Sequence, residues 1–89
     1  MDAQRNKTQK EKIQKQKIEA YKKHIGSSVR AARRARAMTL ADMAELLACS
    51  AEQVRKYEIA ATPLSAARLC LVAERLQLPV RTFLPLNIS

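Results

Sequence analysis

Glycine and aromatic side chains are almost missing from this sequence. It has one Gly, no Trp, one Phe and two Tyr in 89 residues. Strands are rich in aromatic and β-branched residues, whereas Ala, Leu, Lys, Arg and Gln, which are abundant here, favour helices. We therefore expect an all-α fold. A chain of this length supplies about one small domain with one hydrophobic core.

Cysteines and long apolar runs are also scarce. Cys49 and Cys70 lie among apolar neighbours, and two cysteines without a secretory leader predict neither a disulfide framework nor a zinc site. We expect both to be buried free thiols. No apolar run approaches the roughly 20 residues that cross a bilayer, and no apolar signal region is present, so we expect a cytoplasmic protein without a membrane anchor.

The sequence has few groups that carry catalysis or bind metals. His24 is the only histidine, it has no Cys or acid at catalytic or metal-ligand spacing, and Gly26 is not part of a phosphate-binding loop. The serines occur at positions typical of first helical turns or caps: Ser27, Ser28, Ser50 and Ser65. The sequence therefore predicts no enzyme, no metal and no cofactor.

Positive charge, in contrast, is in large excess. There are 17 Lys and Arg against 8 Asp and Glu, which gives a formal net charge of +9 at pH 7. Such a surplus repels itself unless an anionic partner compensates it, and nucleic acid is the obvious polyanion. Residues 1–24 hold eight Lys and Arg against three acids, and residues 25–89 hold nine against five.

Residues 1–24 are expected to form a basic N-terminal arm. Thr8 and Glu11 make a T-x-x-E capping box. The large apolar residues are too sparse for a firm amphipathic stripe: Ile13, Ile18 and Tyr21. An isolated helix of this length is marginal in water, so we expect an arm that is disordered or fraying when free and helical when bound. Two interpretations stay open, a solvated tail and an arm that follows a phosphate backbone.

A run of short helices is expected from Ile25 onwards. Ile25, Val29 and Ala32 share one face of a first helix. Thr39 is a good N-cap for a second helix, with Asp42 at the third helical position. The apolar stripe of this second helix has the spacing i, i+3, i+4, i+7 and consists of Leu40, Met43, Ala44 and Leu47. We expect it to end near Ala48.

The third helix should begin after a gap of about three residues, because Ser50 and Gln53 form an S-x-x-Q capping box. It runs from Ala51 to about Ile59. Pro63 and Ser65 separate it from a fourth helix, and Pro79 then starts a short final one. The result is a compact five-helix bundle over residues 25–84, followed by a tail at 85–89.

Four segments in this order resemble the lambda-repressor-like (Xre or Cro/C1-type) helix-turn-helix family over about Ile25 to Leu84: IGSSVRAAR, MTLADMAELLACS, EQVRKYE and SAARLCLVAERLQL. The resemblance implies that the second helix crosses the DNA backbone and the third lies in the major groove. It implies a sequence-specific, repressor-like transcriptional regulator of bacterial or phage origin. This regulator would bind double-stranded DNA as a homodimer on a palindromic site, without an effector domain.

The resemblance and the outward polar residues also assign a site. The expected base contacts are Ala51, Glu52, Gln53, Arg55 and Lys56. The expected phosphate contacts are Thr39, Ser50, Arg30, Arg34, Lys22 and Lys23. For Arg30, Arg34 and Arg36 a plain solvated face stays equally open. The resemblance implies a structural ion pair between Arg33 and Glu58, which would neutralise a carboxylate close to DNA.

The C-terminal end carries more apolar area than so short a segment needs. The expected dimer interface is Val80, Phe83, Leu84, Leu86 and Ile88, and the alternative is that these residues cover the fourth helix.

Three residues depart from the family pattern. Leu40 replaces a Gln that contacts phosphate, and Ala48 and Ala60 replace glycines. Ala48 must adopt a left-handed backbone or another turn. The alternatives are a motif that no longer binds DNA, an antitoxin-type or other protein-interaction module, an RNA-associated or ribosome-associated protein, and a non-specific nucleic-acid-binding protein.

Overall fold

The computed structural model describes residues 2–85, with side chains from Thr8 onwards. Its elements are α1 (Asp2–Ala35), α2 (Leu40–Leu47), α3 (Ala51–Glu58), α4 (Ala66–Leu76) and a 3-10 turn, η1 (Val80–Phe83). Residues 2–85 contain no strand, which confirms the expected all-α class. The expected number of helices is wrong, because residues 2–85 contain four α-helices and the fifth element is one 3-10 turn after Pro79.

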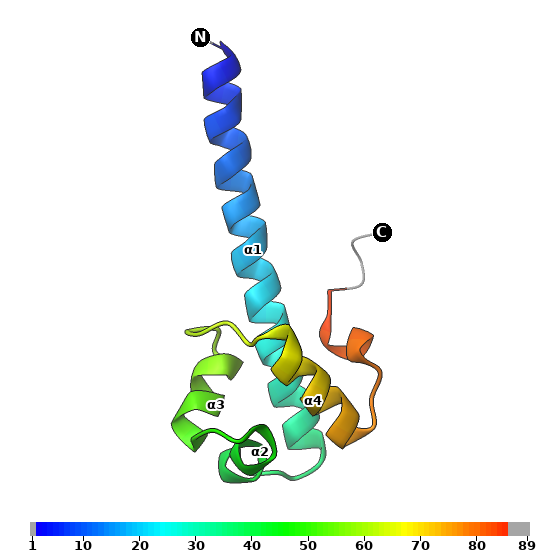
Figure 1. Cartoon of the computed structure of the whole chain (residues 1–89). Helices are drawn as coiled ribbons and strands as arrows, with labels where there is room; N and C mark the ends of the chain where they lie inside the picture. Colours follow the sequence, from blue (N-terminus) through cyan, green and yellow to red (C-terminus); the bar gives the residue numbers. More distant parts are fainter. Residues whose placement is uncertain (1, 86–89) are drawn as a thin grey trace.

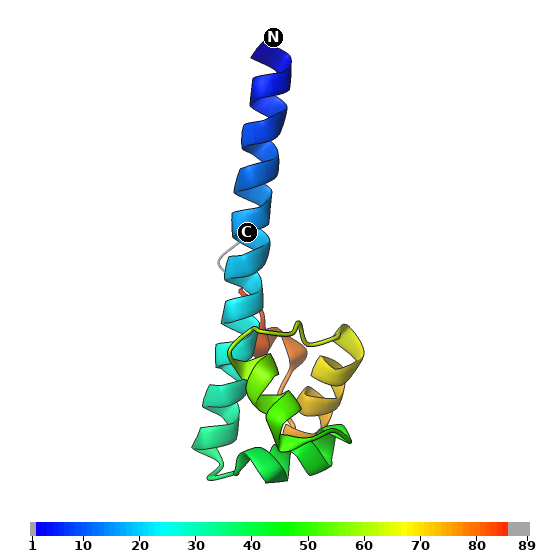
Figure 2. The same ribbon diagram turned by 90° about the vertical axis from the view of Figure 1, so that its left-hand side faces the viewer.

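Helix α1 is a single rod that joins the expected arm to the expected first helix (Figure 1). Its C-terminal part packs against the other helices, and its N-terminal part projects beyond them in both views (Figures 1 and 2). The extents of 54 × 28 × 19 Å reflect this projection. No helix breaker interrupts residues 9–25, so the helix does not begin at Ile25, and Thr8 lies inside it rather than at its N-cap.

The three shorter helices begin where their capping residues predict. The Thr39 hydroxyl accepts the Asp42 N–H at 3.0 Å, and the Asp42 carboxylate accepts the Thr39 N–H at 2.8 Å. Ser50 and Ser65 cap α3 and α4 by accepting backbone N–H groups at 3.0 and 3.1 Å. These bonds satisfy donors that a helix N-terminus leaves unpaired.

Each α-helix ends near a non-glycine residue in the left-handed region: Ala37, Ala48, Ala60 and Gln77. Ala48, at φ 54° and ψ 48°, takes the strained option expected for it. The next residue then bonds back into the helix, as the Cys49 N–H does to the Ala44 carbonyl at 3.0 Å. This backbone geometry lets short helices turn sharply, and the absent glycines leave a steric cost.

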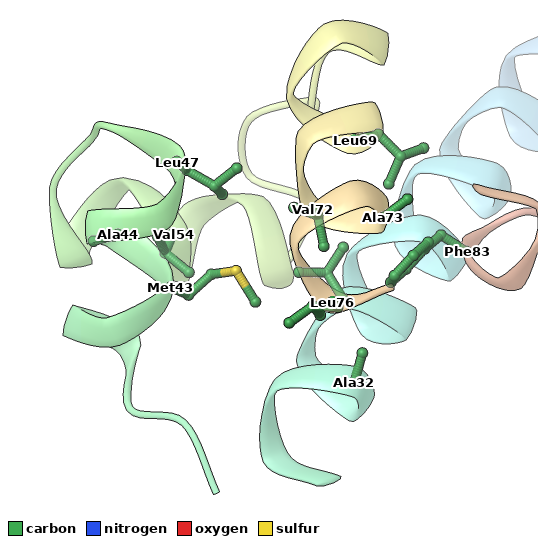
Figure 3. Close-up of a cluster of buried hydrophobic side chains, with 11 residues drawn as sticks. Ala32, Met43, Ala44, Leu47, Val54, Leu69, Val72, Ala73, Leu76 and Phe83 are labelled. Atoms are coloured by element: carbon green, nitrogen blue, oxygen red, sulfur yellow. The ribbon is translucent and has the colours of Figure 1, made fainter. Parts of the chain in front are cut away.

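The core lies where α1, α2, α3, α4 and η1 meet (Figure 3). Val29, Met43, Val54, Val72 and Phe83 are its largest fully buried side chains. Leu76 extends toward Met43, and Phe83 lies beside Ala73 (Figure 3). Of the cysteines, Cys49 is half-buried and Cys70 is exposed, so the expected burial of Cys70 is wrong.

The only glycine, Gly26, lies where α1 contacts the end of α3. A Cβ atom there would lie 2.5 Å from the Tyr57 carbonyl oxygen and 2.7 Å from that of Glu58. Glycine is required because the obstacle is backbone, which cannot move aside as a flexible side chain can. Among the described residues, no helix is apolar over enough length to span a bilayer.

Candidate binding faces on α3 and on the N-terminal part of α1

Fewer side chains of α3 are exposed to solvent than the sequence predicts. Its buried face consists of Val54, Tyr57 and Glu58. Of the five expected base contacts, three are exposed: Glu52, Arg55 and Lys56. Ala51 is half-buried against the core, and Gln53 is half-buried. The exposed face of α3 is therefore a short charged patch.

Two members of this patch bond each other. Arg55 donates from Nε and Nη2 to the two Glu52 carboxylate oxygens, at 3.0 and 2.6 Å. These hydrogen bonds hold the pKa of Glu52 below its ordinary value and raise that of Arg55. Because the pair is exposed, it contributes little to stability. It leaves Lys56 as the one exposed cation on α3 without a carboxylate partner among the described residues.

A second ion pair joins α1 to the end of α3. Arg33 donates from Nε and Nη2 to the Glu58 carboxylate at 2.8 and 3.1 Å, and from Nη1 to the Met38 carbonyl at 2.8 Å. The side chains are only 12% and 4% exposed. The hydrogen bond to Glu58 raises the pKa of Arg33 against the opposing effect of burial. The structure thus contains the ion pair that the sequence resemblance implies.

A hollow of about 240 Å³ lies beside this pair. Its lining comes from α1, from the first residue of α2 and from the end of α3: Arg30, Arg33, Leu40, Arg55, Glu58 and Ile59. Arg33 and Arg55 already have carboxylate partners, and Arg30 has none among the residues described. One uncompensated guanidinium therefore lies at an otherwise neutralised surface.

The six expected phosphate contacts do not form one cluster in the fold. Thr39 and Ser50 are exposed at the N-termini of α2 and α3, where both hydroxyls act as caps. Arg30 and Arg34 are exposed on α1. Lys22 and Lys23 lie farther up α1, and Lys22 donates to Glu19 at 3.1 Å.

Arg36 has a structural role that the sequence does not reveal. Its Nη2 donates to the Leu76 carbonyl at 3.1 Å, and its Nη1 to the Ala32 carbonyl at 3.4 Å. It therefore satisfies the last carbonyl of α4, far away in the sequence. A solvated face and a phosphate contact were the two interpretations open for Arg36. No local pattern could have indicated this contact.

The expected dimer interface needs correction. Phe83 is fully buried in the core, and Leu84 packs against the core. Their apolar area is already used inside the molecule, which matches the alternative that this segment covers α4. Val80 is 39% exposed. Leu86 and Ile88 lie outside the described residues.

Within residues that the structure describes, no group of three or more His, Cys, Asp or Glu residues could hold a metal ion. His24 is exposed on α1.

No family model matches the sequence, and a search of the curated proteins finds no match. Solved structures do match. The structure of apo-HppE is similar with a TM-score of 0.64 and 21% identity, over 73% of this chain and 36% of that chain. Hydroxypropylphosphonic acid epoxidase from S. wedmorenis is similar with a TM-score of 0.66 and 20% identity, over 75% of this chain and 36% of that chain.

These matches establish a shared fold, and this chain spans only about a third of the epoxidase chains. They also correct the functional prediction. The helical arrangement from which we predicted a sequence-specific, DNA-binding transcriptional regulator is that of part of an enzyme chain. The prediction of a regulator that inserts residues 51–59 into the major groove is therefore wrong.

Proposed function

We propose that this chain is a helical accessory module that works with the catalytic unit of an enzyme. The observation that carries the proposal is the similarity, with TM-scores of 0.64 and 0.66, to about a third of hydroxypropylphosphonic acid epoxidase chains. A domain that makes up a third of an enzyme can support the catalytic domain by packing against that domain or by binding the substrate. Function still has to be argued from sites, because one fold serves many functions.

We propose further that the module does not itself catalyse a reaction. A catalytic centre needs a nucleophile, a base or a metal placed beside a cavity. Among the described residues, four carboxylates are bonded within the molecule: Asp42 in a helix cap, and Glu19, Glu52 and Glu58 in ion pairs. The hollow beside Glu58 contains no histidine, cysteine or serine.

The family assignment enters the same proposal. We propose that α2 and α3 form a lambda-repressor-like helix-turn-helix that serves as a packing scaffold. The three-residue connection, the caps at Thr39 and Ser50 and the Arg33–Glu58 pair support this assignment. In a scaffold, the rigid angle between α2 and α3 positions α1, and no side chain of α3 has to read a base. A cytoplasmic location is part of this proposal.

The test begins with the chain isolated from its source cells at low salt. We expect a stoichiometric partner that is an enzyme, and mass spectrometry identifies it. The salt wash that removes the chain should lower the rate of the partner enzyme, and adding back the purified chain should restore it. A Met43→Asp variant, whose core cannot form, should not restore the rate. An unchanged rate after removal, or a complex with nucleic acid alone, would contradict the accessory role.

A further inference from the structure

The part of α1 that projects from the body carries an apolar seam that continues its buried face. We call residues 8–24 the arm. Ile18 lies seven residues before Ile25, and Tyr21 lies eleven before Ala32. Seven and eleven residues are close to two and three helical turns, so Ile18 and Tyr21 lie on the core-facing side of α1. They lie N-terminal to the part of α1 that packs into the core, however, and are 51% and 37% exposed.

Lysines flank this seam on both sides. In the heptad that places Ile18 and Ile25 at position a and Tyr21 at d, position e holds Lys15 and Lys22, and position g holds Lys10 and Lys17. Positions e and g lie beside the seam and set the choice of partner between packed helices. Four of the six e and g positions of the arm are lysines, the other two are Thr8 and His24, and none is acidic, so the rim of the seam is basic.

Three other polar groups bear on the seam. Gln14 and Glu11 occupy its d and a positions toward the N-terminus, so the apolar part is short. Glu19 lies outside the seam and accepts a hydrogen bond from Lys22 at 3.1 Å, with side chains that are 57% and 36% exposed. An exposed pair of this kind is weak and can exchange for an intermolecular one.

We propose that the seam of the arm is a docking site for an acidic amphipathic helix of a partner protein. That helix would place apolar residues against Ile18 and Tyr21 and Glu or Asp side chains against Lys10, Lys15, Lys17 and Lys22. The partner is acidic because four of the six flanking positions are lysines and none is acidic. It is helical because the two apolar residues recur at helical spacing along a straight rod.

Charge also argues against the other occupants. Two copies of the arm would set lysines opposite lysines in either orientation, which disfavours a homodimer along this seam. A nucleic acid would attract the outward lysines, Lys12 and Lys23, as strongly as the flanking ones, and its backbone offers no apolar surface to Ile18. Only the identification of the partner protein as part of an enzyme rests on the proposed function.

The test uses the full chain and two synthetic four-heptad peptides. Both peptides have Leu at a and d, and they carry either Glu or Lys at e and g. In fluorescence anisotropy we expect the Glu peptide to bind and the Lys peptide not to bind. Binding should weaken as the salt concentration rises from about 0.1 to about 1 M, because screening removes the contribution of the rim.

Matched variants separate the seam from the overall charge. Ile18→Ser should weaken binding of the Glu peptide by at least about tenfold. Ile13→Ser should not, although Ile13 is also 51% exposed, because Ile13 lies off the seam. Lys10→Glu/Lys17→Glu should abolish binding, whereas Lys12→Glu/Lys23→Glu, with the same change in net charge, should retain most of it. Far-UV circular dichroism checks that each variant keeps its helix.

Three outcomes would overturn the docking site. Equal losses in the two double variants would mean that the arm attracts polyanions without a defined seam. Tighter binding of random duplex DNA than of the Glu peptide would assign the arm to nucleic acid. Dimers in sedimentation that Ile18→Ser dissociates would assign the seam to a second copy. The peptide result does not depend on any enzyme, and the rate experiment uses the wild-type arm, so either proposal can fail alone.

Discussion

Gly26 sets how closely α1 approaches α3. Because a Cβ atom would lie 2.5 Å from the Tyr57 carbonyl oxygen, Gly26→Ala should force the two helices apart. We expect the free energy of unfolding in urea to fall by about 1 to 3 kcal/mol. Ser27→Ala, at the exposed neighbouring position, should change stability by less than about 0.5 kcal/mol. Equal stability of the Gly26→Ala variant and the wild type would mean that the contact relaxes easily.

Arg33 and Glu58 should behave as a coupled pair. Arg33→Met leaves a carboxylate that is 4% exposed without its cation, and we expect a loss of about 3 to 5 kcal/mol of stability. Arg33→Met/Glu58→Met should cost less than Arg33→Met alone, because no buried charge is left unpaired. A double-mutant cycle of urea unfolding measures this coupling. Additive losses would show that the two side chains stabilise the fold independently.

The N-termini of the short helices have favourable side-chain caps, whereas their C-termini carry backbone strain. Ala48 has φ 54°, so Ala48→Gly should relieve strain and raise stability by about 1 kcal/mol. The same substitution at Ala41, an exposed position inside α2, should lower stability by about 0.5 to 1 kcal/mol. Thermal unfolding of both variants gives the two signs, and a loss in both would contradict the strain at Ala48.

The N-terminus of α2 should make stability depend on pH. Hydrogen bonds to Thr39, the backbone N–H first, lower the pKa of Asp42 below its ordinary value of 3.8. A carboxyl whose pKa is lower in the folded state stabilises the fold above 3.8, and this contribution is lost as the pH falls through the folded value. Asp42→Asn should therefore lose less stability than the wild type between about pH 5 and pH 3 in urea titrations. Parallel losses would place the pH dependence elsewhere.

Sequence patterns located the short helices better than the long one. The starts of α2, α3 and α4 follow from Thr39, Ser50 and Ser65, since a capping side chain acts on its own first turn. The start of α1 was missed because the density of apolar residues changes at Ile25 while the helix continues. The density of apolar residues and the length of the helix are separate properties, and only the density of apolar residues changes at Ile25.

The site was less predictable than the fold, because its residues depend on distant contacts. Phe83 looked like surplus apolar area in the sequence, yet it fills the core beside Ala73. Arg36 bonds the end of α4, which no local spacing reveals. The polar face of α3 has the composition of a helix that contacts base edges, but a solvated face has the same composition. Similarity to part of an epoxidase contradicts the prediction of a DNA-binding regulator.

Helix α1 joins two parts of the molecule that should differ in stability. Residues 8–20 are exposed throughout, whereas Val29 is 1% exposed within the core. A helix without tertiary contacts opens by local fraying, and buried segments open with the cooperative unfolding of the domain. In hydrogen exchange with mass spectrometry, we expect amides of the arm to exchange at least about tenfold faster than those around Val29.

The acidic peptide should change this pattern at one place. Docking on the seam removes Ile18 and Tyr21 from water, so exchange should slow in the arm while the amides of α4 keep their rates. The Lys-flanked peptide should leave both unchanged. If the arm of the free protein already exchanges as slowly as the core, another contact covers it. Measuring the exchange rates after dilution tells whether that contact is with a second copy or within the chain, because only self-association depends on concentration.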